Sequence, residues 1–225
     1  MNIKEGIQRT VEGSDLSKNN ASEIMREILT GKATPAQFGS FVTALRVKGE
    51  TPEEIAGMVQ TMREFSLHVE TNVPVIDTCG TGGDSKGWFN ISTATALVVA
   101  GADIPVAKHG NRAMSGSTGS ADVLELLGVN ISHGPDVIKE SIEKIGIGFM
   151  FAQVFHPAMK FAGPLRPEIG IRTIFNILGP LTNPAKAKRQ VIGTSDQVTA
   201  KKNSRNIENI GYRIFYGRTL RIRSR

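Results

Sequence analysis

The strongest constraint on the fold of this chain is a set of four small-residue loops between Asp77 and Asp122. Glycine and serine have little side chain to cover the backbone, so these loops expose N–H groups, and lysine, arginine and hydroxyl side chains lie among them. A ligand with several phosphates needs this combination of close backbone approach and fixed positive charge. The loops occupy residues 77–84, 90–93, 108–112 and 115–120.

Short apolar strands alternate with helices after residue 73. The predicted strands are 75–77, 104–107 and 147–151, and the predicted helices are 92–102, 120–127 and 136–145. This alternation is typical of a parallel α/β sheet, in which ligands bind beyond the carboxyl ends of the strands. The four loops are therefore expected to meet at one sheet edge, with Lys108 and His109 just beyond a strand.

The N-terminal third is predicted to be helical. Thr34 and Thr51 each precede a proline and are followed three positions later by Gln or Glu, which is the pattern of a capped helix start. Asn20 is predicted to cap an earlier helix that ends at Leu29. The predicted helices run from 20 to 29, from 34 to 48 and from 51 to 67, and residues 156–184 are predicted to be helical again.

Composition argues against several classes of protein. The sequence has no apolar run of 18 residues, so no membrane span is expected, and its start lacks an apolar signal segment. The lone cysteine, Cys79, fits a reducing cytoplasm and is expected to be buried. The net charge of +6 comes from residues 201–225, which hold eight Lys or Arg and one acid. The remainder is near neutral, so no nucleic-acid partner is expected.

Each loop also has an ordinary explanation. Asn90 and Ser92 are good helix caps, Lys108 could be a solvated strand end, and residues 115–120 could form a linker. One polyphosphate ligand accounts for all the loops together. His109 follows a lysine and precedes Gly-Asn-Arg, which favours a substrate-lining role, whereas the other histidines lack metal-ligand spacing and are expected to be structural.

Five segments closely resemble the anthranilate phosphoribosyltransferase family of tryptophan biosynthesis. They are residues 77–84, 89–93, 108–112, 119–122 and 172–184. The resemblance extends from the N-terminal helices to about Ala200. It implies a helical domain joined to a parallel-sheet α/β domain, a cytoplasmic homodimer, and Mg²⁺-dependent transfer of phosphoribose from phosphoribosyl pyrophosphate to anthranilate.

The resemblance also implies residue roles. Ser92 would help to bind Mg²⁺, and Gly80, Asn111 and Arg166 would face anthranilate, the arginine pairing its carboxylate. Catalysis would rest on electrostatic stabilisation by Lys108 and His109 rather than on an acid or base. The residues implied for phosphoribosyl pyrophosphate are Gly80, Gly83, Asp84, Asn90, Ile91, Ser92, Thr93, Lys108, His109, Gly110, Asn111, Arg112, Ser115, Gly116 and Ser120.

Two departures from the family pattern lie in these loops. Trp88 stands where a threonine is usual, and Gly116-Ser117 replaces the usual Ser-Lys, which removes a positive charge.

The expected domains follow the same resemblance. Residues 1–72 are expected to form a helical dimerisation domain, and the chain is expected to return to that domain at about residues 157–184. Residues 73–156 and 185–202 are expected to form the phosphoribosyl pyrophosphate-binding domain. The basic tail, 203–225, does not resemble the family. It is possible to choose codons for residues 203–211 that encode an amphipathic helix when they are read one base later. A frameshift near Lys201 is therefore predicted. A divergent basic tail is the alternative. The sheet is then incomplete at its C-terminal end and this chain is expected to be nearly inactive.

Two other functions stay open at this point. A pyrimidine-nucleoside phosphorylase of related fold would also carry a Lys-His loop and a glycine loop, but it would take a nucleobase rather than an aromatic acid. A non-catalytic fragment that only dimerises through its N-terminal helices is the other alternative.

Overall fold

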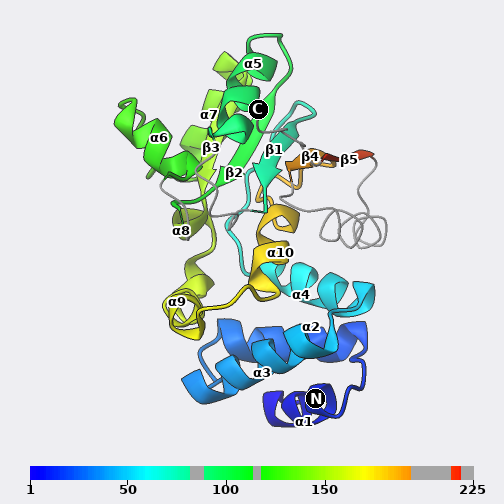
Figure 1. Ribbon diagram of the computed structural model, residues 1–225. Helices are drawn as coiled ribbons and strands as arrows, with labels where there is room; N and C mark the ends of the chain where they lie inside the picture. Colours follow the sequence, from blue (N-terminus) through cyan, green and yellow to red (C-terminus); the bar gives the residue numbers. More distant parts are fainter. Residues whose placement is uncertain (82–88, 114–117, 194–213, 219–225) are drawn as a thin grey trace, which may run out of the picture.

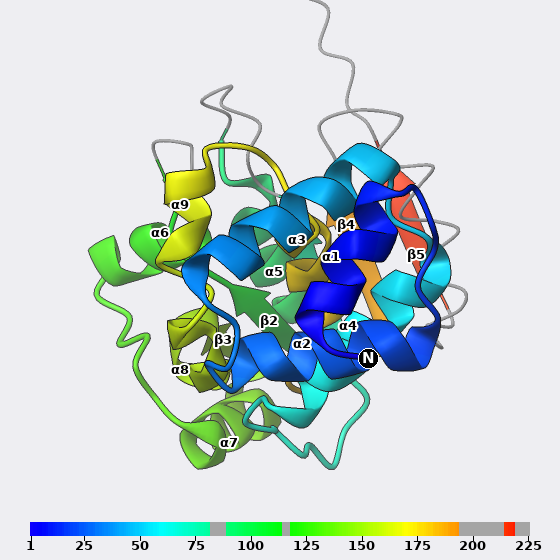
Figure 2. The same cartoon turned by 90° about the horizontal axis from the view of Figure 1, so that it is seen from below.

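A computed structural model describes residues 1–81, 89–113 and 118–193, and the backbone of 214–218. A helical bundle lies at one end and a parallel sheet with its helices at the other (Figure 1). Seen from below, the bundle lies in front of the sheet (Figure 2). The predicted combination of a helical domain and a parallel α/β domain is therefore confirmed. No helix in these described segments is long and apolar enough to cross a membrane.

The bundle helices begin at capping residues. The four helices are α1 (Ile3–Val11), α2 (Lys18–Leu29), α3 (Pro35–Lys48) and α4 (Pro52–Glu64). The capping boxes of Thr34 and Thr51 are both formed, so these two predictions are confirmed. The predicted cap Asn20 is wrong, because Ser17 caps α2 and accepts a hydrogen bond from the Asn20 backbone. α4 ends three residues before the predicted Leu67.

Five parallel strands form one sheet in the order β3-β2-β1-β4-β5. The strands are β1 (Ile76–Gly80), β2 (Val106–Gly110), β3 (Ile147–Phe151), β4 (Arg189–Gly193) and β5 (Ile214–Arg218). The helices between them are α5 (Ile91–Ala100), α6 (Ser120–Leu126) and α7 (Pro135–Ile145). Lys108 and His109 lie inside β2 rather than beyond it, because pairing with β3 continues to Gly110.

The two faces of the sheet pack against different helices. α7 covers the face that carries Ala107 and Met150, which belong to one hydrophobic cluster with Ile138 and Ile142. α6 packs on the opposite face through Leu124 and a cluster that includes the neighbouring Phe149. Side chains alternate along each strand, so Lys108 and His109 point to opposite faces.

The segment after β3 returns to the bundle. It forms α8 (Ala152–Phe155), a 3-10 helix (Pro157–Lys160), α9 (Leu165–Ile169) and α10 (Phe175–Leu181). Phe175 and Leu178 of α10 belong to the main core of the bundle helices, and Cys79 and Ile192 join that core from the sheet. One hydrophobic core therefore ties the bundle to β1 and β4, and Cys79 is buried as expected.

β5 lies within residues 203–225, the segment expected to be a basic tail that does not resemble the family. Ile214–Arg218 pairs with β4 in parallel over five positions, from Arg189 to Gly193. The described sheet therefore includes part of the 203–225 segment. A frameshift as the origin of this segment stays a prediction.

Candidate functional site

The site lies where the backbone pairing of β1 and β2 stops, on the carboxyl side of its first pair, and we call this break the β1–β2 opening. The register between them pairs Ile76 with Val106, whereas β1 and β4 pair over five positions. Beyond that first pair, side chains rather than a continuous ladder join the two strands. An opening of this kind gives polar side chains access to the edge of the sheet where ligands of parallel sheets bind.

Lys108 crosses this opening from the face that carries α5. Its side chain is 2% exposed, and its Nζ donates hydrogen bonds to the Thr78 carbonyl oxygen at 2.6 Å and to Ser92 Oγ at 3.3 Å. An ammonium group has three donors, so these bonds leave one for a ligand. Burial lowers the pKa of Lys108, and the nearby Asp77 and Cys79 act in the opposite direction.

Asp77 crosses the opening from the other face. It is fully buried, and its Oδ1 accepts a hydrogen bond from the backbone N–H of His109 at 3.2 Å. Its Oδ2 accepts from Gln190 Nε2 at 2.8 Å, and Asn183 also bonds the carboxyl. Burial raises the pKa of Asp77, while the charge of Lys108 and these hydrogen bonds lower it. Sequence reasoning assigned none of these three residues a role.

The N-terminus of α5 lies beside Lys108. Asn90 caps the helix, and its Oδ1 accepts hydrogen bonds from the Thr93 backbone at 3.3 Å and the Thr93 hydroxyl at 2.8 Å. Ser92 is tied to β1, because its carbonyl oxygen accepts from Thr78 Oγ1 at 2.8 Å. Asn90, Ser92 and Lys108 thus meet at one point, whereas the predicted site residue Ile91 is 44% exposed. The partial positive charge of a helix N-terminus favours an anion here.

The residues after β2 fold back onto the start of α6. The Asn111 carbonyl oxygen accepts hydrogen bonds from the Ala121 backbone at 3.2 Å and from Ser120 Oγ at 3.3 Å. A Cβ on Gly110 would lie 2.1 Å from Ser120 Oγ, so only glycine allows this approach. Asn111, Gly110 and Ser120 are therefore brought together.

Asp122 holds both ends of the 113–119 loop. Its Oδ2 accepts from the backbone N–H groups of Ala113 at 2.9 Å and Gly119 at 2.8 Å. Arg112 pairs with Asp122 and with Glu125, at 3.2 and 2.7 Å. These carboxylates raise the pKa of Arg112, whose side chain is 42% exposed. The guanidinium predicted to bind phosphate is therefore engaged by α6 in this structure.

Two buried histidines lie on the far side of β2 from Lys108. The rings of His109 and His156 are 5.0 Å apart between centroids, and neither Nε2 has a hydrogen-bond partner among the described residues. Burial lowers the pKa of His109 to about 4 and that of His156 to about 3. Both rings are therefore neutral at pH 7, and His156 lies beside a predicted site residue although the sequence indicated only a structural role.

Arg166 lies in α9, which follows β3 and α8 along the chain (Figure 1). Its guanidinium stacks on Phe175, with 5.6 Å between Cζ and the ring centroid. Within the described segments no carboxylate pairs with it, and burial lowers its pKa. A partly buried cation without an internal counter-charge is suited to an anionic ligand.

Several predicted positions lie outside the described residues. They are Gly83, Asp84, Ser115 and Gly116, together with the departures at Trp88 and Ser117. Gly80 is described, and it lies exposed at the end of β1.

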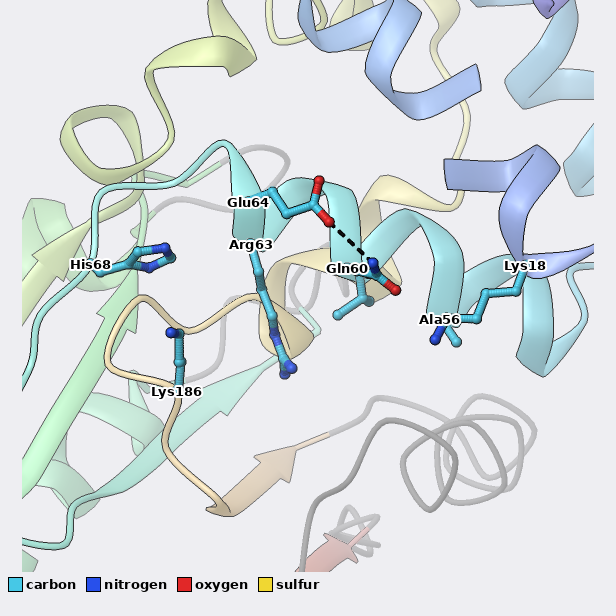
Figure 3. A pocket seen from close by; sticks show the side chains of 8 residues that line it. Lys18, Ala56, Gln60, Arg63, Glu64, His68 and Lys186 are labelled. Carbon is cyan, nitrogen blue, oxygen red and sulfur yellow. Dashed lines mark hydrogen bonds between the residues drawn. The ribbon is translucent and has the colours of Figure 1, made fainter. Parts of the chain in front are cut away.

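A hollow of about 350 Å³ lies elsewhere, beside α4 (Figure 3). Gln60, Glu64 and Arg63 of α4 line it, and Lys186 faces them from the segment before β4. Arg63 is engaged there, since its Nη2 donates to the Leu181 carbonyl oxygen at 2.8 Å. None of the predicted site residues borders this hollow.

Comparison with known proteins identifies the family. The profile of the glycosyl transferase family a/b domain matches residues 72–214, and the profile of its helical bundle domain matches residues 4–66. The chain belongs to the glycosyl transferase family. The a/b-domain match continues past Ala200, where the resemblance was expected to end.

Among relatives in this family, anthranilate phosphoribosyltransferase of Chloroflexus aurantiacus is 59% identical over 202 residues, which are 90% of this chain and 60% of the relative. The Roseiflexus enzyme of the same name is 56% identical over 211 residues, 94% of this chain and 62% of its own length. This chain thus spans about 60% of these relatives.

Solved structures of the family show the same fold. Anthranilate phosphoribosyltransferase from Thermus thermophilus superimposes with a TM-score of 0.87 at 43% identity, covering 92% of this chain and 63% of that chain. The enzyme from Saccharomyces cerevisiae in complex with PRPP and Mg gives a TM-score of 0.82 at 24% identity, over 93% of this chain and 63% of its own. The second likeness concerns the fold alone.

Proposed function

We propose that this chain carries the phosphoribosyl pyrophosphate site of an anthranilate phosphoribosyltransferase. The reaction transfers the phosphoribosyl group to anthranilate and yields N-(5-phosphoribosyl)anthranilate and pyrophosphate, a step of tryptophan biosynthesis. The observation that carries this proposal is the buried Lys108 ammonium, which has a free donor beside Ser92 and the N-terminus of α5. The names of the relatives at 56–59% identity support the same activity.

The substrate would lie across the β1–β2 opening. The pyrophosphate and ribose would be bound by Lys108, Asn90, Ser92 and Thr93. The loop tied by Asn111 and Ser120 would hold further phosphate oxygens. The other residues proposed to line the phosphoribosyl pyrophosphate site are Gly80, Gly83, Asp84, Ile91, His109, Gly110, Arg112, Ser115 and Gly116. Arg166 would pair the anthranilate carboxylate, with Gly80 and Asn111 facing the ring. Backbone donors and fixed cations suit the polyanion.

Mg²⁺ fits this site if the substrate supplies most of its ligands. The described residues contain no group of three or more His, Cys, Asp or Glu that could hold a metal. Ser92 Oγ and Asn90 Oδ1 lie together at 3.4 Å and are hard oxygen donors. We propose that Ser92 helps to hold Mg²⁺ bound chiefly by the phosphates, where the ion would neutralise charge on the leaving pyrophosphate.

The protein's part in the chemistry is electrostatic and positional. The bond from C1 of the ribose to pyrophosphate breaks toward an oxocarbenium-like state, and the anthranilate amine attacks from the opposite face with inversion. The proton that the new secondary amine sheds passes to the departing pyrophosphate or to water. Lys108 stabilises the departing negative charge, and the neutral His109 lines the site. Arg166 orients the amine by fixing the carboxylate beside it. Such preorganised charges and proximity supply the rate enhancement without a general acid or base.

The protein is proposed to work as a cytoplasmic homodimer that contacts its partner through the N-terminal helices. The resemblance to the family motivates this proposal, and Val11 at the end of α1 and Val47 in α3, which are 68% and 82% exposed, are suitable positions at which to test it. Equilibrium sedimentation of Val11→Lys/Val47→Lys tests this, since loss of dimer is expected and an unchanged mass would contradict the contact.

Loss of anthranilate fluorescence on adding phosphoribosyl pyrophosphate and Mg²⁺ tests the activity. We would assay the 225-residue chain beside a chimera that continues into the remaining part of the Chloroflexus relative. Turnover by the chimera is expected, and the 225-residue chain alone is expected to be far slower, because it spans only about 60% of the length of the relatives that carry this name. Comparable kcat/KM values would contradict the second expectation.

The two alternatives make different predictions in the same assay. A nucleoside phosphorylase would turn over a pyrimidine nucleoside with inorganic phosphate and leave anthranilate unchanged, and the names of the relatives do not favour it. A non-catalytic fragment would dimerise but bind no phosphoribosyl pyrophosphate in either form.

A further inference from the structure

We propose that Asp122 is a positioning residue of the phosphate site. Its carboxylate closes the loop between β2 and α6, and the closed loop holds Asn111 and Ser120 in the places where the substrate would meet them. This inference rests on the proposed function, which assigns substrate contacts to both of those residues. Asp122 itself would not touch the substrate.

The two ends of the loop meet on one carboxylate oxygen. Asp122 lies in the first turn of α6, and its Oδ2 accepts hydrogen bonds from the backbone N–H groups of Ala113 at 2.9 Å and Gly119 at 2.8 Å. An ionised acceptor makes these bonds stronger than neutral ones would be. Among the described residues these two N–H groups have no other acceptor, so the closure depends on this one side chain.

The backbones at the two ends of the loop are in direct contact. A Cβ on Gly119 would lie 2.4 Å from the Ala113 nitrogen and 2.6 Å from the Asn111 carbonyl oxygen. That carbonyl oxygen also accepts a hydrogen bond from Ser120 Oγ at 3.3 Å. The first residues after β2 therefore lie against the start of α6, and the contact that Asp122 closes also sets the place of Asn111.

The side chain of Asn111 keeps its donors for a ligand. Its Oδ1 accepts from the backbone N–H of Arg112 at 2.8 Å, which fixes the orientation of the amide. Its Nδ2 can donate two hydrogen bonds and has no acceptor within the part of the chain that the structure describes. The closed loop thus presents two oriented donors beside the proposed phosphate site.

The charge of Asp122 makes this role testable. A carboxylate beside a polyanion opposes its binding, so loss of the charge alone should tighten binding. Arg112 offsets part of that charge, with its Nη1 at 3.2 Å from Asp122 and at 2.7 Å from Glu125. If Asp122 supports binding through the loop, its removal should weaken binding instead. The electrostatic effect and the positioning effect therefore have opposite signs.

The test is binding of phosphoribosyl pyrophosphate to the 225-residue chain, measured by calorimetry with Mg²⁺ present. Asp122→Ala removes both hydrogen bonds and should raise the dissociation constant at least about tenfold. Asp122→Asn keeps an oxygen that can accept from both N–H groups, and the exposed ion pair it loses contributes little, so its dissociation constant should stay within about threefold of the parent's. Asp136→Ala is the matched control, because it removes an acid from the first turn of α7, and it should bind like the parent.

A second variant covers the case in which Asp122→Ala does not fold. The hydroxyl of Asp122→Ser can accept from one of the two N–H groups, which supports the start of α6, and it leaves the other without a partner. Its dissociation constant should be about fivefold above that of the parent. Affinity equal to the parent's in this variant would overturn the proposal.

The other outcomes are equally decisive. A purely stabilising role of Asp122 would lower the urea midpoint of Asp122→Ala and leave the dissociation constant of the folded chain unchanged. Unchanged or tighter binding by Asp122→Ala would therefore overturn the proposal, as would equal losses in Asp122→Ala and Asp122→Asn, or a loss of the same size in Asp136→Ala. If the parent chain binds no phosphoribosyl pyrophosphate, the proposed function fails together with this inference, whereas equal binding by parent and Asp122→Ala overturns this inference alone.

Discussion

Replacement of Arg166 by alanine should weaken anthranilate binding far more than phosphoribosyl pyrophosphate binding. The guanidinium stacks on Phe175 and has no carboxylate partner in the described structure. Burial already lowers its pKa, so the charge is held in an environment poorer than water in stabilising dipoles. A carboxylate that enters this environment gains a strong, planar pair of hydrogen bonds.

The magnitude follows from the partial burial of this group. Truncating one member of a desolvated charge pair costs about 2–4 kcal/mol, because the remaining carboxylate is left without a partner. At about 1.4 kcal/mol per factor of ten, the KM for anthranilate should rise roughly 30- to 700-fold. The KM for phosphoribosyl pyrophosphate should change less than about threefold, because Lys108 and α5 bind that substrate in the proposed site.

The assay is the fluorescence decrease of anthranilate in the chimera described above, with each substrate varied in turn. Arg166→Lys keeps the charge but loses the fork, so its anthranilate KM should fall between those of the parent and Arg166→Ala. Arg46→Ala, at an exposed position of α3, is the matched control and should match the parent. An equal rise of both KM values in Arg166→Ala would refute the assignment.

Three further predictions concern the described site. Lys108→Met should weaken phosphoribosyl pyrophosphate binding at least about thirtyfold in calorimetry, since it removes a desolvated charge, and unchanged affinity would place the phosphates elsewhere. Gly119→Ala should cost about 1–3 kcal/mol in urea unfolding, because its Cβ would lie 2.4 Å from the Ala113 backbone nitrogen, while Gly134→Ala, with open space around it, should be nearly neutral. In the folded chain the buried His109 and His156 have pKa values of about 4 and about 3, whereas the pKa of an unfolded histidine is near 6.5. As the pH falls below 6.5, these two side chains therefore become protonated in the unfolded chain before they do so in the folded chain. The free energy of unfolding should therefore decrease between pH 6.5 and 4, and this decrease should be roughly 2 kcal/mol smaller in His156→Gln than in the parent chain. The same pH dependence in both proteins would contradict the burial argument.

The sequence predicted helix starts well where two signals coincide. Thr34 and Thr51 each combine a cap, a following proline and a Gln or Glu three residues later, and both helices begin there. At α2, Ser17 and Asn20 are both good caps within one turn, and local chemistry does not decide between them. Tertiary packing does, because the preceding Leu16 is buried and its backbone N–H donates to the buried Glu54 at 2.8 Å. Such contacts over long sequence distances are invisible to a local pattern.

The strand edges show the same limit. The apolar run Ile104–Ala107 predicts a strand that stops before Lys108, yet β2 runs from Val106 to Gly110. A lysine and a histidine within a central strand contradict the usual pattern of buried strands. The structure accommodates them because the Thr78 carbonyl oxygen accepts from the Lys108 ammonium and Asp77 accepts from the backbone N–H of His109. The first α-helix was missed although Asn2 and Glu5 form a capping box, a signal present in the sequence.

The site residues that sequence reasoning did not assign share one property, which is that their partners are distant in the chain. Asp77 stands in the first motif, but its role depends on Gln190, 113 residues away. His156 was expected to be structural, and its neighbour His109 becomes apparent only when β2 and α8 are brought together. Loops rich in glycine can be recognised locally because their backbone conformation is a local property. A buried charge acquires its function from the groups around it, so the partners of Asp77 and of Lys108 have to be located in three dimensions.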